Sequence, residues 1–144
     1  MNYKEIEYNI YENGEVKETK TERFRLTSGA CQTLEKNTNK SILEYLQDES
    51  MTTVLTVLRY MRFFEDKTYT VNQAQDLYDT LIDNGWTFKR ILQDIIYETL
   101  VVSGFLEESE WKEMKETTNQ LMKELKEEQK KALKSLVQTD LQNT

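Results

Sequence analysis

The spacing of apolar residues changes once, near residue 27, and this change constrains the fold more than any other feature. From Tyr3 to Tyr11, apolar and polar residues alternate. The residues of the apolar face are Ile6, Tyr8 and Ile10. A period of two predicts a half-buried β-strand. Asn13–Gly14 then favours a tight hairpin turn, so the stretch from Val16 to about Leu26 is expected to be the return strand.

Beyond residue 27, apolar residues recur every three or four positions, which predicts helices. Ser41 with Glu44 and Thr70 with Gln73 have the spacing of capping boxes and predict two helix starts. The stretch Met51–Phe64 has the widest apolar arc, which is typical of a central core helix. Helix ends are expected at two glycines that can adopt a left-handed cap at low cost. These are Gly85, after Asn84, and Gly104, after Ser103.

The composition changes at Glu107. Residues 107–134 contain eight acidic and seven basic residues and few apolar ones. This pattern is typical of a long, solvated helix. We therefore predict a mainly α (α+β) fold with an N-terminal β-hairpin, a compact helical bundle and a long charged C-terminal helix. The predicted boundaries are residues 1–106 for the globular core and 107–144 for the helical extension.

A narrow apolar stripe follows the extension at alternating spacings of three and four. Its first members are Trp111, Met114, Thr118, Leu121 and Leu125. After Leu125 the stripe shifts by one residue, and such a stutter straightens a helix. One interpretation is a solvated helix that packs only at its Trp111 end. The other is a docking helix or a self-association seam, for which the candidate binding residues are Trp111, Met114, Leu121 and Leu125.

The residue types for most catalytic and metal sites are missing. The chain has no histidine and one cysteine, Cys31, so neither an imidazole base nor a thiolate zinc site can form. No phosphate-binding or calcium-binding motif occurs. We therefore predict a non-enzymatic protein with no catalytic residues, metal or cofactor. A net charge of -7 disfavours nucleic acid as a partner. No apolar run is long enough to span a membrane, so the expected location is the cytoplasm.

A cluster of aromatic residues in the predicted core has two interpretations. Its members are Tyr60, Phe63, Phe64 and Trp86, with Met61 beside them. They could line a groove for a partner, because methionine and aromatic side chains adapt to varied apolar surfaces. Core packing explains the same residues, and we favour that interpretation.

Taken in order, these segments resemble the tail assembly chaperones of long-tailed bacteriophages of Gram-positive hosts. The resemblance covers about three quarters of the chain. It runs through the strands Glu5–Tyr11 and Phe24–Leu26, the stretch Leu43–Phe64 and the capped helix Thr70–Ile82. It ends with the passage Ile95-Ile96-Tyr97-Glu98-Thr99-Leu100-Val101-Val102-Ser103-Gly104-Phe105-Leu106. The matching features are the order and size of the elements, and no signature motif is among them.

The resemblance implies a role in virion assembly in the host cytoplasm. Such chaperones bind the tape-measure protein, keep it soluble and help tail-tube protein to polymerise around it. The implied partners are therefore the tape-measure protein and the tail-tube protein, with self-association as a further use of the same stripe. The alternative is an acidic regulatory adaptor, antitoxin-like or anti-repressor, that masks another protein. The neighbouring genes would separate the two, because a tape-measure gene directly downstream favours the chaperone.

Overall fold

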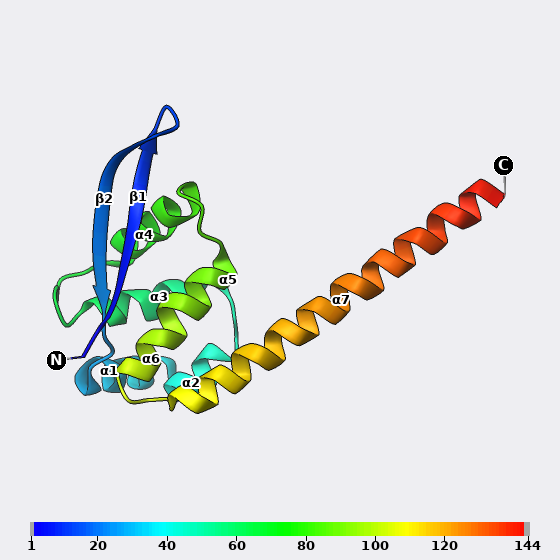
Figure 1. Cartoon of the computed structure of the whole chain (residues 1–144). Coiled ribbons are helices and arrows are strands. Elements are labelled where there is room, and N and C mark those ends of the chain that lie inside the picture. The colour runs from blue at the N-terminus through cyan, green and yellow to red at the C-terminus, as the bar shows by residue number, and fades with distance from the viewer. Residues whose placement is uncertain (1, 143–144) are drawn as a thin grey trace. The chain divides into compact units, whose positions relative to one another are not determined.

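The chain begins with a two-stranded antiparallel hairpin, β1 (Lys4–Glu12) and β2 (Glu15–Phe24). The computed structural model describes the backbone of residues 2–142 and side chains up to residue 139 (Figure 1). Asn13 and Gly14 form the turn with φ values of 56° and 80°. Asparagine and glycine are the residues that adopt positive φ most easily, so this turn follows from local sequence.

The hairpin packs at its base and extends beyond the core at its turn. Ile6 and Tyr8 on β1 are buried, and so is Phe24 at the end of β2. A bulge between Ile10 and Tyr11 shifts the register, so that Tyr11 pairs with Val16 and both side chains are exposed. The alternation of buried and exposed residues in β1 therefore ends where the hairpin extends beyond the core.

The helices follow in chain order. They are α1 (Ser28–Thr38), α2 (Ile42–Leu46), α3 (Met51–Arg62), α4 (Val71–Asp83), α5 (Phe88–Arg90), η1 (Ile91–Tyr97), α6 (Glu98–Val102) and α7 (Glu108–Gln142). The predicted fold class, a hairpin followed by helices and a long C-terminal helix, is confirmed. Residues up to Glu107 form one compact unit, and residues from Glu108 onward form a second.

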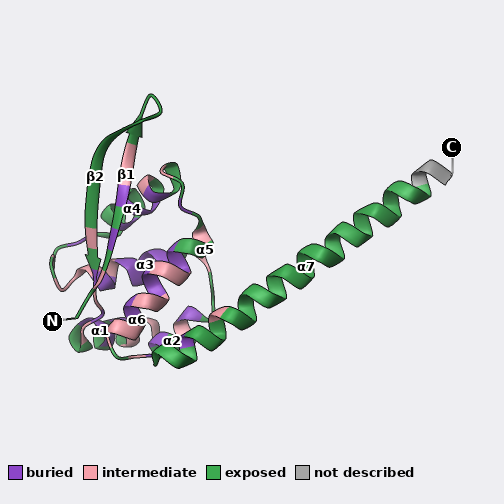
Figure 2. Cartoon of the chain, viewed as in Figure 1, coloured by how far each residue is buried: buried purple, intermediate pink, exposed green. Residues whose placement is uncertain are grey.

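Helix α3 is the centre of the first unit. It contacts α1, α2, α4, η1 and β2. Its fully buried side chains are Val54, Val57, Leu58 and Met61. Because neighbours cover α3 on several sides, only a narrow strip of the helix is exposed. This burial explains the wide apolar arc in its sequence. Figure 2 shows the buried residues concentrated in α3 and in the elements around it.

The helix starts and ends agree with the local signals. Thr70 and Gln73 form a complete capping box, while at Ser41 the side chain accepts from the backbone N–H of Glu44. Gly85 and Gly104 have φ values of 94° and 85°. The backbone N–H of Phe105 donates to the carbonyl of Leu100 at 2.9 Å, which is the six-residue hydrogen bond of a Schellman ending.

The predicted helix after Thr87 is present, but its middle is not α-helical. Residues Ile91–Tyr97 form a π-helix between α5 and α6. The buried residues of this region recur every four positions. They are Ile91, Leu92, Ile95, Ile96, Thr99 and Leu100. Side chains spaced four residues apart do not stay on one face of an α-helix, because it has 3.6 residues per turn. The wider π-turn reduces that drift and keeps both rows of side chains in the core.

Arg62 joins the base of the hairpin to the end of α3. Its guanidinium forms ion pairs with Glu22 at 3.3 Å and Glu65 at 3.0 Å, and it donates to the backbone carbonyl of Arg23. It also lies 5.9 Å from the ring centroid of Phe24. Because the Arg62 side chain is largely buried, these contacts are less screened than surface ion pairs.

Tyr8 gives the fold a sensitivity to alkaline pH. Burial, and to a lesser degree the neighbouring Glu22, raises the pKa of Tyr8 from 10.0 to about 12. Between pH 10 and 12 the unfolded chain therefore loses this proton while the folded chain keeps it, so the free energy of unfolding falls as pH rises. We expect Tyr8→Phe to show a shallower fall than the native chain in urea titrations across this range. Parallel curves for the two proteins would contradict this assignment.

Candidate protein-binding surface

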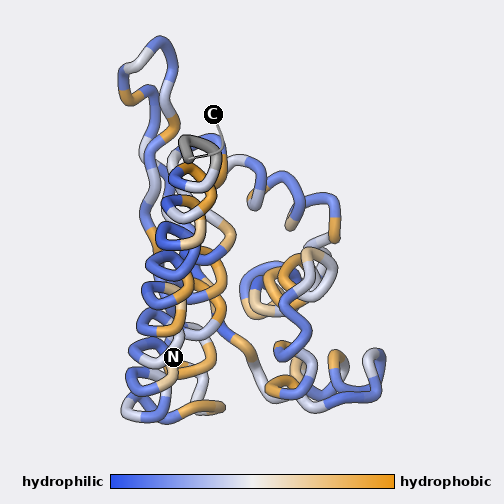
Figure 3. The backbone as a smooth tube through the Cα atoms, turned by 90° about the vertical axis from the view of Figure 1, so that its right-hand side faces the viewer, coloured by the Kyte–Doolittle hydropathy of each residue, from blue (hydrophilic) through white to orange (hydrophobic). Residues whose placement is uncertain are grey.

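Helix α7 presents a continuous row of apolar side chains to solvent. Over the described side chains, the large exposed members are Met114, Leu121, Met122, Leu125, Leu133, Leu136 and Val137. Each has between 41% and 64% of its surface exposed. Figure 3 shows hydrophobic positions recurring among hydrophilic ones along the helix that ends at the C-terminus. We call these seven residues the α7 stripe.

The predicted binding residues divide into two groups. Met114, Leu121 and Leu125 belong to the α7 stripe. Trp111 is only 5% exposed, and the ammonium of Lys115 lies 5.4 Å from its ring centroid. Met122, Leu133, Leu136 and Val137 were not predicted as binding residues. The signal for three of them was available, because Met122, Leu133 and Leu136 extend the apolar face toward the C-terminus.

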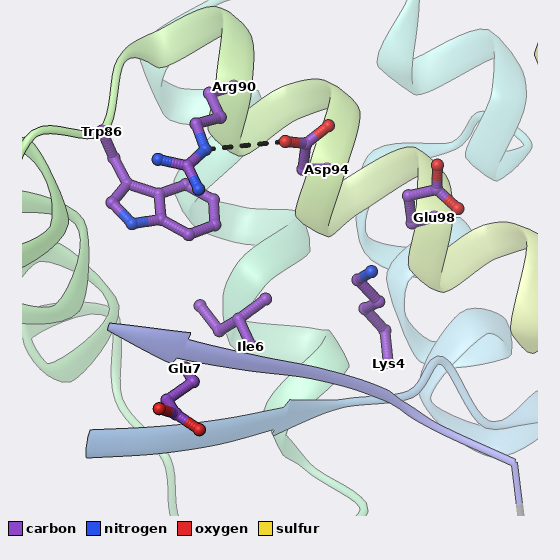
Figure 4. Close-up of a pocket in the computed structure, with 7 residues that line it drawn as sticks. All are labelled: Lys4, Ile6, Glu7, Trp86, Arg90, Asp94 and Glu98. Carbon is purple, nitrogen blue, oxygen red and sulfur yellow. Dashed lines mark ion pairs between the residues drawn. The ribbon is translucent and has the colours of Figure 1, made fainter. Parts of the chain in front are cut away.

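The first unit contains a shallow pocket of about 230 Å³ between β1 and the helix that runs through α5, η1 and α6 (Figure 4). The guanidinium of Arg90 lies over the ring of Trp86, 3.8 Å from its centroid. Arg90 also forms an ion pair with Asp94 at 3.6 Å. Lys4 and Ile6 reach the pocket from β1, while Glu7 points away from the helix.

This pocket has mixed charge. Its seven lining residues provide two cations, three carboxylates, one indole and one aliphatic side chain. None of them carries a hydroxyl or a thiol that could act as a nucleophile. We interpret the stacked Arg90 and Trp86 as a contact that fixes the loop before α5.

The aromatic cluster of the first unit belongs to the core. Tyr60 and Trp86 are buried, as is Met61, which confirms core packing for these residues. Phe63 and Phe64 are half-buried, and the Phe63 ring lies 5.0 Å from that of Tyr60. Trp86 is nevertheless one of the residues that line the shallow pocket beside β1, which is small and of mixed charge. The α7 stripe is therefore the better candidate for a binding surface.

The thiol of Cys31 has low reactivity. It is buried on α1, and burial together with the nearby Glu35 raises the pKa of its thiol to about 11. A thiol reacts through its thiolate form, which is scarce at neutral pH when the pKa is this high. Among the side chains of residues 2–139, no cluster of three or more acidic or cysteine groups is placed to hold a metal ion, and none of the described helices could cross a membrane.

Comparisons with known proteins add no assignment. A scan against protein-family models, a search of curated proteins and a search of solved structures found no match to this chain.

Proposed function

We propose that this protein is an assembly chaperone that binds a long helical client through the α7 stripe. The observation that carries this proposal is the exposure of seven large apolar side chains along one helix. Single exposed apolar residues are common on proteins, but a continuous row of them marks a surface that binds another chain. The rest of the helix is strongly charged, which keeps such a surface in solution.

The length of the stripe indicates what kind of client fits. From Met114 to Val137 it extends for about 35 Å at 1.5 Å per residue. A stripe of this length suits another amphipathic helix, which can bury its own apolar face along the whole row. A compact ligand would cover only part of it. The client should therefore be a helical protein with an exposed apolar stripe.

The resemblance to tail assembly chaperones supplies the client. A tape-measure protein is long and helical, and its apolar stripes would aggregate before the tail tube encloses them. We propose that the α7 stripe covers them until assembly, and that the tail-tube protein is the second partner. The net charge of -7 supports a protein client, because it works against binding to nucleic acid.

Co-expression with tape-measure fragments tests the proposal. We expect such fragments to become soluble and to co-purify with the native chain. The double substitution Leu121→Asp and Leu125→Asp should abolish co-purification. Burial of two leucines contributes about 3–6 kcal/mol to binding, so their loss weakens the complex by roughly 100-fold or more. The melting temperature of the first unit should not change, because neither leucine is part of its core.

Asn119→Asp with Gln120→Asp is the matched control. It adds the same charge to the same helix but leaves the α7 stripe intact, so co-purification should persist. Fragments that stay equally insoluble with and without the native chain would rule out the chaperone function. Unchanged co-purification of the leucine variant would instead show that α7 is not the binding surface.

A further inference from the structure

Five of the seven residues of the α7 stripe follow an eleven-residue period. Met114, Leu125 and Leu136 are eleven residues apart, and so are Met122 and Leu133. Eleven residues make three turns of 3.67 residues each, which is close to the 3.6 of an undistorted α-helix. These five residues therefore run nearly parallel to the helix axis from Met114 to Leu136, while Val137 lies in line with Lys115 and Lys126. A straight, periodic stripe can stay in contact with a second helix over many turns, which a single anchor residue cannot do.

Between residues 110 and 130 the charges beside the stripe are sorted by sign, whereas Lys131, the next residue, lies on the acidic side. With about 100° between successive residues, all five lysines between residues 110 and 130 lie on one side of the helix. These are Lys112, Lys115, Lys123, Lys126 and Lys130. Four glutamates of the same interval lie on the other side. These are Glu110, Glu113, Glu124 and Glu128. The remaining two acids, Glu116 and Glu127, lie on the face opposite the stripe.

This arrangement selects one partner and one orientation. When two identical helices face each other in parallel around a two-fold axis along their length, the acidic side of each meets the basic side of the other on both edges. In an antiparallel pair, acid would meet acid and base would meet base. Flanking charges of this kind set partner choice and orientation in paired helices. A parallel second copy of α7 is therefore complementary to α7 in both apolar and charged groups.

We propose that, in the free protein, the α7 stripe is covered by the α7 stripe of a second copy of this chain, in parallel and in register. The pair is held by the leucine and methionine side chains in its centre and by Glu–Lys contacts along its edges. This pairing concerns the protein alone and stands whether or not a tape-measure protein is its client.

Disulfide cross-linking measures the orientation directly. In a full-length Cys31→Ala chain, Met114→Cys and Leu136→Cys each place one thiol at opposite ends of the stripe. In a parallel pair, each variant should cross-link with itself under mild oxidation. Neighbouring thiols in a pair have an effective concentration on the order of millimolar, so at micromolar protein they should react about 1000-fold faster than free ones. Glu127→Cys, on the face opposite the stripe, is the matched control and should cross-link slowly.

Two results would overturn the proposal. Cross-linking only when the Met114→Cys and Leu136→Cys chains are mixed would show an antiparallel pair. Sedimentation that gives a monomer at all concentrations, with all cysteine variants as slow as the control, would show no pair. A further variant, Glu110→Lys with Glu124→Lys, reverses two of the four acidic charges and leaves an excess of lysine on both edges, so it should dissociate the dimer at low salt more than at high salt. Because no client is present, the failure of client binding would leave these results unchanged.

Discussion

Phe24→Ala is expected to lower the free energy of unfolding by about 3–5 kcal/mol, the usual cost of removing a buried phenylalanine ring. Phe24 is completely buried at the base of β2, and the guanidinium of Arg62 lies over its ring. Its loss would leave a cavity where the hairpin meets α3. Urea denaturation followed by tryptophan fluorescence measures the change.

Tyr11→Ala provides the control on the same hairpin. Tyr11 is 51% exposed near the turn, so its replacement should change the free energy of unfolding by no more than about 0.5 kcal/mol. A large difference between the two variants would establish that the base of the hairpin belongs to the core and that its tip does not. Equal, small effects would contradict the packing of β2 on α3.

A chain that ends at Glu107 is expected to fold, melt cooperatively and lose all client binding and self-association. The first unit contains its own core, and α6, which ends at Val102, is closed by the Phe105 hydrogen bond before the cut. Circular dichroism should show a large loss of helical signal, because the removed segment is one 35-residue helix. Thermal melting should keep a single sharp transition.

A second truncated chain, ending at Met114, separates the role of Trp111. It keeps Trp111 but loses the α7 stripe beyond Met114. If both truncated chains melt at the same temperature, Trp111 has no part in the stability of the first unit. A broad, non-cooperative transition in both would show that residues up to Glu107 do not fold alone.

Features set by nearby residues could be predicted from the sequence. The hairpin turn needs only an asparagine and a glycine, and a helix start needs only a capping residue such as Thr70 with Gln73 three positions later. The residues that make these interactions lie within about four positions of one another, so a short stretch of sequence is enough to predict them. The central position of α3 was also predictable, because an apolar arc as wide as its own requires neighbours on several sides.

Part of the candidate surface was also predictable from a local signal, the spacing of apolar residues. Met114, Leu121 and Leu125 were predicted from their spacing alone, and they are exposed on α7. Spacing cannot tell an apolar residue that is buried from one that is open to solvent. Trp111 lies at the start of the same pattern, yet it is buried.

Other features were decided by the tertiary structure. The π-turns of η1 exist because two rows of side chains four residues apart must face one core, and local propensity favours an α-helix there. Arg62 meets Glu22 across 40 positions of sequence, and no pattern near either residue indicates the other. Sequence therefore determined where the hairpin turns and where the capped helices begin, since those choices are local. Packing decided which side chains are buried and how the elements meet, because those contacts join residues that are distant in the chain.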